Sequence, residues 1–280
     1  MSEIGIVDEC GISRVAHEED IGYYNVWKIA SASGNYILKK STPRELAVYR
    51  SYLSQVKLAV PRLLGSTEFH DDVYILLEHI SDSDLRKCTR EALISALDAL
   101  ISIQDKFWES QEMDGVGTSF EESMEARKSR GEYIKYPEIK RAYNDYLTAY
   151  TDLPRTLCHD DLLPFNVIYD GSRAVLIDWE HAGILPYPTP ITRLIAHCSD
   201  DENAFFYMND ADKEFAVEYY FEHFIKGKGI SRADYMRSVD LFLLYEYCEW
   251  IMLGKKYGET NSARYKEYLR KAADLVSPAP

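Results

Sequence analysis

The chain has 280 residues, of which 46% are hydrophobic and 28% are charged, and its formal net charge is −14. This composition is typical of a globular protein with a large core. The acidic balance argues against nucleic acid as a partner, because phosphate binding requires a basic surface, and it is compatible with a cationic substrate.

The first residues and the cysteines lead to expectations about location. No apolar run reaches the roughly 18 residues that a bilayer-spanning helix needs. Residues 1–20 are acidic and lack the basic and apolar regions of a secretory signal. The five cysteines are scattered without CxxC spacing, which favours reduced thiols over disulfides or a zinc site. We therefore expect a cytoplasmic protein with no membrane partner.

Strand-like segments fill the first eighty residues. Residues 24–30 and 35–39, separated by a short polar turn, predict a β-hairpin. A helix is expected from about residue 44, where Thr42-Pro43 provides a start signal. Two more strands are expected at 62–65 and 73–77, the second as a continuous apolar run.

Helical patterns dominate after residue 79. Residues 91–109 carry a clear amphipathic stripe, and further helices are expected at 137–150, 212–224 and 240–253. Between them, residues 156–183 alternate short apolar runs with polar turns. Strands followed by helices predict an α+β protein. We expect a small antiparallel-sheet lobe over residues 1–79 and a larger helical lobe over residues 80–280.

The segment between these helices carries the chemistry. A His-x-Asp motif ends at Asp161, Asn166 follows five positions later, and a strand at 174–177 leads directly to Asp178. This spacing matches the kinase catalytic loop, in which an Asp accepts the proton of the substrate hydroxyl while an Asn and a later Asp bind metal. We therefore predict Asp161 as the catalytic base and Asn166 and Asp178 as Mg²⁺ ligands, because Mg²⁺ prefers oxygen ligands.

The N-terminal lobe offers candidate nucleotide-binding residues. A strand ending in Lys39 resembles the kinase strand whose lysine contacts the ATP phosphates, and Glu45 in the following helix would hold that lysine. Lys40 is the alternative, because a one-residue slip in register would turn it inward. The last strand leads to a hinge from Glu78 to Ile80, and we expect the backbone there to bind adenine.

Two features of protein kinases are missing from the sequence. A glycine-rich phosphate loop is absent, and only Gly22 lies near the expected turn. The APE element is also absent, and there is no room for a long activation segment before the final helices. A protein kinase is therefore disfavoured, and a kinase of small molecules is the better interpretation.

These residues resemble the aminoglycoside phosphotransferase and choline kinase superfamily. Residues 177–183, IDWEHAG, are similar to the IDWEYAG-like segment of bacterial choline kinases. The resemblance implies a two-lobed protein-kinase-like fold, ATP as phosphoryl donor and Mg²⁺ as cofactor. It also implies a small acceptor, either an aminoglycoside-type antibiotic or an amino alcohol similar to choline or ethanolamine. Two departures are Asp160, where aminoglycoside kinases usually carry Gly, and residues 190–194, which lack the Asp of an Asp-Leu-Ala element.

The acceptor site is assigned to the aromatic and acidic helix over residues 240–253. Tyr247, Glu249 and Trp250 are predicted to bind substrate, because aromatic rings and carboxylates attract ammonium groups. Aromatic residues at helical spacing also form ordinary core, and that interpretation stays open. The alternative function is a nucleotide-binding pseudokinase that acts through interaction. The sequence leaves open the acceptor, the choice between ATP and GTP, and the oligomeric state.

Overall fold

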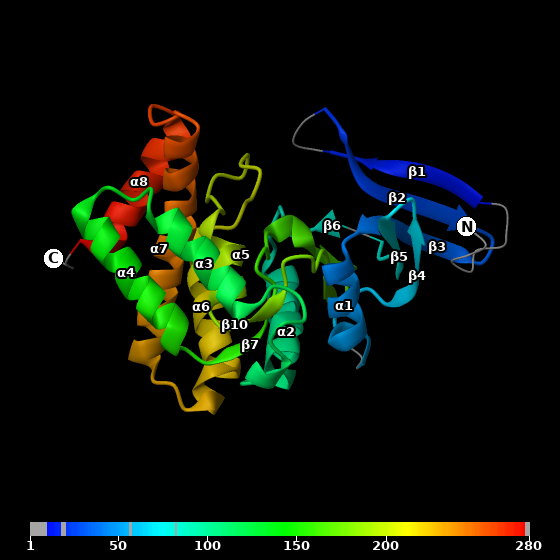
Figure 1. The fold of residues 1–280 in the computed structure, drawn as a ribbon, viewed down its shortest axis with the longest axis horizontal. Coiled ribbons are helices and arrows are strands. Elements are labelled where there is room, and N and C mark those ends of the chain that lie inside the picture. Colours follow the sequence, from blue (N-terminus) through cyan, green and yellow to red (C-terminus); the bar gives the residue numbers. More distant parts are fainter. Residues whose placement is uncertain (1–9, 18–20, 56–57, 82, 278–280) are drawn as a thin grey trace.

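The computed structural model describes residues 10–17, 21–55, 58–81 and 83–277. A β-sheet forms one end of the molecule and a group of helices forms the other (Figure 1). The α+β class is therefore confirmed. Along the described residues, no helix combines the length and apolar character that crossing a membrane requires.

The N-terminal sheet has five antiparallel strands within the described residues, in the order β1-β2-β3-β5-β4. Their bounds are β1 (Cys10–Ala16), β2 (Tyr23–Ser31), β3 (Gly34–Ser41), β4 (Leu63–Phe69) and β5 (Asp72–Glu78). The predicted hairpin is β2 and β3, and β3 is central because β5 pairs on its other side. The expected place of a phosphate loop, near Gly22, includes residues 18–20, which lie outside the described residues.

Helix α1 (Pro43–Ser51) begins where the sequence predicts a helix start. The side chain of Thr42 accepts a hydrogen bond from the backbone N–H of Glu45, and Pro43 occupies the first turn, where its missing N–H costs nothing. The helix buries Glu45 together with three apolar side chains, Leu46, Val48 and Tyr49. A short 3₁₀ turn, η2 (Leu53–Gln55), follows it.

The C-terminal part is mainly helical. Its helices are α2 (Arg90–Lys106), α3 (Phe120–Gly131), α4 (Pro137–Asp152), α5 (Thr189–Ala196), α6 (Asp210–His223), α7 (Arg232–Lys256) and α8 (Ala263–Val276). Its 3₁₀ turns are η3 (Gln111–Met113), η4 (Pro164–Asn166) and η5 (Ile225–Lys228). The long helix α7 packs against α4, α5 and α8 and so lies at the centre of the C-terminal part (Figure 1).

Short strands cross the middle of the molecule between the sheet and the helices. The strands β6 (Ser83–Asp84), β8 (Val167–Tyr169) and β9 (Ala174–Leu176) form one small sheet. A second pair consists of β7 (Arg155–Cys158) and β10 (Gly183–Pro186). The predicted catalytic loop lies between β7 and β8, and Asp178 lies just after β9.

Two apolar clusters stabilise the helical part. The larger one joins α1 and α2 to the central strands, and Trp179 is fully buried in it. The second is aromatic and lies between α3, α4 and α7, where Tyr146 stacks on Tyr245 with ring centroids 4.8 Å apart. Aromatic pairs of this kind contribute beyond their buried area. Many of the tyrosines of this acidic chain are therefore core residues.

The sequence patterns identify most elements but not all. Strand β1 and helices α3, α5 and α8 are not among the predicted elements. Strand β5 ends at Glu78, next to the predicted lobe boundary. The division into residues 1–79 and 80–280 remains a prediction.

Candidate active site

Lys39 lies between two carboxylates at the boundary of the sheet and the helical part. Its Nζ is 2.8 Å from Glu45 Oε1 and 2.5 Å from Asp178 Oδ1. Glu45 is fully buried and also accepts a hydrogen bond of 2.6 Å from Ser41 Oγ. Burial alone would lower the pKa of Lys39, but Asp178 and Glu45 raise it. The lysine therefore carries its positive charge at neutral pH.

Lys40 points to the other face of the strand. Its Nζ is 2.7 Å from Asp72 Oδ2, and both side chains are 39% exposed. Neighbouring residues of a strand face opposite sides. Because Lys39 contacts the buried Glu45, the register of β3 turns Lys39 inward and Lys40 outward.

The backbone of the predicted catalytic loop is held by two side chains. His159 is fully buried; its Nε2 donates to the carbonyl oxygen of Ile177 at 2.7 Å, and its Nδ1 accepts the backbone N–H of Asp161 at 3.3 Å. Burial lowers the pKa of His159, which agrees with a neutral ring. Asn166 Nδ2 donates to the carbonyl oxygen of Asp161 at 2.8 Å. Both contacts fix the loop at Asp161.

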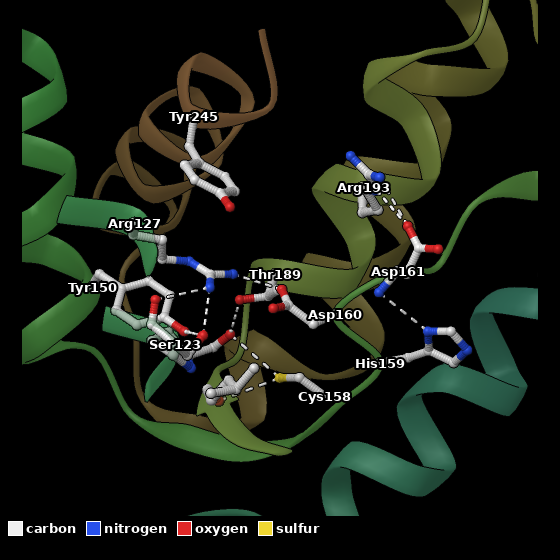
Figure 2. Close-up of polar contacts among 12 residues, drawn as sticks. Ser123, Arg127, Tyr150, Cys158, His159, Asp160, Asp161, Thr189, Arg193 and Tyr245 are labelled. Atoms are coloured by element: carbon white, nitrogen blue, oxygen red, sulfur yellow. Dashed lines mark hydrogen bonds and ion pairs between the residues drawn. The ribbon is translucent and has the colours of Figure 1, made fainter. Parts of the chain in front are cut away.

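The carboxylate of Asp161 is held through one oxygen. Its Oδ1 accepts hydrogen bonds from Arg193 Nη2 at 2.8 Å and from Arg193 Nε at 3.1 Å (Figure 2). In the described part of the chain, no such contact reaches Oδ2, and the side chain is 28% exposed. One oxygen of the predicted base therefore remains available to an acceptor.

Asp160 is held by a different arginine. Arg127 Nη2 of α3 lies 2.6 Å from Asp160 Oδ1, and Figure 2 shows the guanidinium between the tyrosine rings of α4 and α7. The guanidinium carbon lies 4.5 Å from the ring centroid of Tyr150 and 4.8 Å from that of Tyr245. Asp160 is thus neutralised by a buried cation.

Arg193 also contacts helix α7. Its Nη1 lies 2.7 Å from Glu246 Oε2 and 2.5 Å from Glu249 Oε2. Arg130 Nη1 approaches the other oxygen of Glu249 at 3.2 Å. Glu249, a predicted substrate-binding residue, therefore shares its carboxylate between two arginines.

The two predicted aromatic substrate residues lie on α7 as well. Trp250 stacks on Tyr268 with centroids 5.7 Å apart, and the guanidinium carbon of Arg264 lies 4.5 Å from the Trp250 ring centroid. Tyr247 contacts the ring of Tyr268, with centroids 5.8 Å apart. A bound ammonium group would have to compete with Arg264 for Trp250. The role of Tyr247 and Trp250 in substrate binding stays a prediction.

Carboxylate oxygens, which Mg²⁺ prefers as ligands, surround Asp178, one of the two predicted metal ligands. One carboxylate oxygen each from Glu45, Asp178 and Glu180 lie within 4.8 Å of one another. Asp178 has φ of 65°, in the left-handed region that non-glycine residues adopt uncommonly. Burial would raise the pKa of Asp178, but Lys39 lowers it, so the carboxylate is ionised, as a metal ligand would need to be. Because Asn166 Nδ2 donates to the loop, its amide oxygen is the atom left for a metal. The oxygen donors of Asn166 and Asp178 are therefore of the kind that Mg²⁺ binds.

A cavity of about 490 Å³ lies at the predicted hinge. Lys28, which lines it, pairs with Ile37 of β3 and therefore faces the same side of the sheet as Lys39. Glu78 donates its backbone N–H to the carbonyl oxygen of Arg62 at 3.0 Å, and Ile80 follows two residues later. The cavity is further lined by Gly11, Ser13, Ala30, Asn35 and His79.

Comparison with known proteins gives the class of this chain. The model of the phosphotransferase enzyme family, known as APH, matches residues 18–214, which is more than half of the chain. The chain therefore belongs to this family, and it is a small-molecule kinase. None of the curated proteins matches the chain significantly.

Solved structures of kinases share the fold. The amicoumacin kinase hAmiN, in complex with AMP-PNP, Ca²⁺ and Ami, has a TM-score of 0.62 at 16% identity, covering 95% of this chain and 87% of that one. A choline/ethanolamine kinase family protein from Mesorhizobium loti has a TM-score of 0.58 at 15% identity, with coverages of 96% and 88%. The aminoglycoside phosphotransferase APH(3'')-Id from Streptomyces rimosus, in complex with ADP and streptomycin, has a TM-score of 0.54 at 14% identity, with coverages of 78% and 90%. The two-lobed kinase-like fold is therefore confirmed.

Three arginines of the site were not predicted as functional residues. Arg127 and Arg130 lie on α3, a helix that the sequence patterns do not identify. Arg193 lies within residues 190–194, the segment that lacks the Asp of the Asp-Leu-Ala element. The missing Asp was the one feature of the sequence that could have pointed to Arg193.

Proposed function

We propose that this small-molecule kinase transfers the γ-phosphoryl group of ATP, with Mg²⁺, to a hydroxyl group, and that Asp161 is the base. The observation that carries the proposal is the group formed by Lys39, Glu45 and Asp178, beside a loop in which one oxygen of Asp161 is available. Phosphoryl transfer depends mainly on positioning and charge stabilisation. In this proposal Asp161 positions the hydroxyl group and Lys39 stabilises the charge of the phosphates.

Each residue has a role in the proposed reaction. Lys39, held by Glu45, contacts the phosphates, and the hinge from Glu78 to Ile80 contacts adenine beside the cavity. Asp161 Oδ2 accepts the proton of the acceptor hydroxyl while the hydroxyl oxygen bonds to the γ-phosphorus and the bond from phosphorus to the ADP oxygen breaks. Mg²⁺, held by Asn166 and Asp178, would neutralise charge on the β- and γ-phosphates.

For the acceptor we propose an alcohol that bears an ammonium group. The net charge of −14 and the partly exposed Glu180 support it, as do the relatives described as a choline/ethanolamine kinase family protein and as a kinase in complex with streptomycin. The pairing of Glu249 with two arginines adds a condition, because a cation that binds Glu249 competes with both of them for its oxygens. Glu249, Tyr247 and Trp250 remain the proposed contacts.

A neutral polyhydroxy acceptor is the second candidate. It is favoured by the arginines beside the base, Arg127, Arg130 and Arg193, which already neutralise most of the local carboxylates. Hydroxyl groups can bond to these paired ions without displacing them.

A kinetic panel separates the candidates. It comprises choline, ethanolamine, several aminoglycosides and neutral sugars, with ATP or GTP, at low and high salt. An ammonium-bearing acceptor should show the higher kcat/KM and lose affinity in salt, because exposed charges are screened over about 8–10 Å. Preference for neutral sugars would contradict the cationic acceptor. Nucleotide binding with no turnover of any acceptor or of water would instead support a pseudokinase.

A further inference from the structure

We propose that Arg193 is a positioning residue that fixes the orientation of the Asp161 carboxylate. The inference rests on the proposed function and goes beyond it, because it explains which oxygen of the base is presented to the acceptor. Two nitrogens of Arg193 bond to the same oxygen, Oδ1 (Figure 2). A carboxylate held in this way cannot rotate freely, so Oδ2 is the oxygen that faces the acceptor.

Arg193 is itself fixed from the opposite side. Its Nη1 is shared by Glu246 and Glu249 of α7, while its Nη2 and Nε reach Asp161. The Arg193 side chain is only 15% exposed, so these partners leave the guanidinium little freedom. Helix α7 therefore determines the position of the base through one side chain of α5.

Arg193 keeps its positive charge at neutral pH. Burial alone would lower the pKa of Arg193, but Glu246, Glu249 and Asp161 raise it well above its ordinary value. His197 Nε2 also faces the cluster, 3.0 Å from Arg193 Nη1, and Arg130 faces it through Glu249. Arg193 thus acts as a permanent cation surrounded by three carboxylates.

The geometry requires an arginine in particular. The guanidinium is a planar fork whose nitrogens point in different directions, whereas a lysine has one flexible ammonium group. A lysine at position 193 could contact either Asp161 or the glutamates, but it could not hold all three as Arg193 does. The effect of Arg193→Lys therefore distinguishes positioning from simple charge neutralisation.

The experiment measures ATP hydrolysis with water as the acceptor, which needs no identified substrate. Arg193→Lys and Arg193→Gln should lower kcat by about 10–100-fold, because a displacement of about 1 Å at a reacting group can cost that much. The affinity for AMP-PNP should stay unchanged, since Lys39 and Asp178 are not touched. Guanidinium chloride at millimolar concentration should partly restore kcat of Arg193→Ala, whereas sodium chloride should not.

A matched control separates positioning from stability. Arg90→Gln breaks another ion pair between helices, with Asp212, whose side chain is 8% exposed, outside the site. It should change the melting temperature but not kcat. In an Asp161→Asn background, Arg193→Gln should cause little further loss, because the group that it positions is gone.

Three results would overturn the inference. The first is a kcat loss in Arg193→Gln no larger than in Arg90→Gln. The second is a double variant, Asp161→Asn with Arg193→Gln, whose kcat loss equals the product of the two single losses. The third is that guanidinium chloride does not restore kcat of Arg193→Ala. If the wild type hydrolyses ATP and Asp161→Asn does not, the proposed function stands whatever Arg193 does. A wild type without any phosphoryl transfer would overturn both.

Discussion

Lys39 Nζ of strand β3 lies 2.5 Å from Asp178 Oδ1, although the two residues are 139 positions apart in the chain. This contact joins the sheet to the central segment of the helical part. It places a partly buried cation beside the predicted metal ligand, where the phosphates of a nucleotide would need both. The pair is therefore where the proposed function expects the phosphates of the nucleotide.

The orientation of β3 predicts that substitution of Lys39 lowers kcat/KM for ATP more than substitution of Lys40. Lys39→Met should reduce kcat/KM for ATP strongly, because it removes the cation that pairs with both Glu45 and Asp178. Lys40→Met should be mild, since Lys40 pairs with the exposed Asp72, and exposed pairs contribute about 0–1 kcal/mol. Steady-state kinetics of both variants test this, and equal losses would mean that the register of β3 does not decide phosphate contact.

Asp178 should determine the metal dependence of nucleotide binding. Wild-type protein is expected to bind ATP more tightly in Mg²⁺ than in EDTA, because Mg²⁺ held by Asp178 would neutralise charge on the phosphates. Asp178→Asn should remove most of this difference and abolish turnover. Calorimetric titration with ATP in both buffers gives the comparison. An unchanged Mg²⁺ effect in the variant would exclude Asp178 as a ligand.

The segment IDWEHAG should be sensitive to added volume at its last residue. A Cβ at Gly183 would lie 2.1 Å from the carbonyl oxygen of Thr118, so Gly183→Ala must displace backbone. We expect a loss of about 1–3 kcal/mol in the free energy of unfolding, the usual cost of overpacking. Gly227→Ala is the matched control, because a Cβ there meets no atom within 4 Å. Equal stability of the two variants in urea unfolding would contradict the close approach.

The ion cluster around Arg193 should make stability depend on acid pH. The Glu246 carboxyl is buried, which would raise its pKa, but Arg193 and His197 lower it from 4.5 to about 2. A depressed folded-state pKa stabilises the protein above the unfolded value, and this contribution is lost as the pH falls from 4.5 toward 2. Glu246→Gln should therefore cost about 1–3 kcal/mol near neutrality.

The pH profile of that loss provides the test. The difference in unfolding free energy between wild type and Glu246→Gln should be constant above pH 5 and should shrink below about pH 4.5. Chemical denaturation at a series of pH values measures it. A difference that grows as the pH falls would contradict the assigned charge of Glu246.

Local patterns were sufficient to select Lys39, Glu45 and Asp178 as candidates, with Lys40 left as the alternative to Lys39. The alternation that turns Lys39 inward, the helix start at Thr42-Pro43 and the spacing from Asp161 to Asn166 are all short-range features of the sequence. The structure brings Lys39, Glu45 and Asp178 together in the way that this spacing suggests. Their assigned roles in binding and catalysis remain predictions.

Long-range pairing explains what the sequence could not provide. Arg193 contacts Asp161, 32 positions away in the sequence, and Glu249, 56 positions away. No local sequence pattern predicts either contact. The sequence therefore presented Glu249 as a free carboxylate, although it is paired with Arg193 and Arg130. Strand β1 and helices α3, α5 and α8 were missed because tertiary packing outweighs their weak local signals.

The most direct test of the account is the turnover of Asp161→Asn beside that of Asp274→Asn, an exposed aspartate of α8 that serves as the matched control. Both are measured for ATP hydrolysis and for the best acceptor of the panel, together with AMP-PNP affinity. We predict that Asp161→Asn keeps nucleotide affinity and loses kcat by about 10²–10⁴-fold, the usual scale for a positioned base, while Asp274→Asn matches the wild type. Wild-type turnover in Asp161→Asn would contradict the central claim.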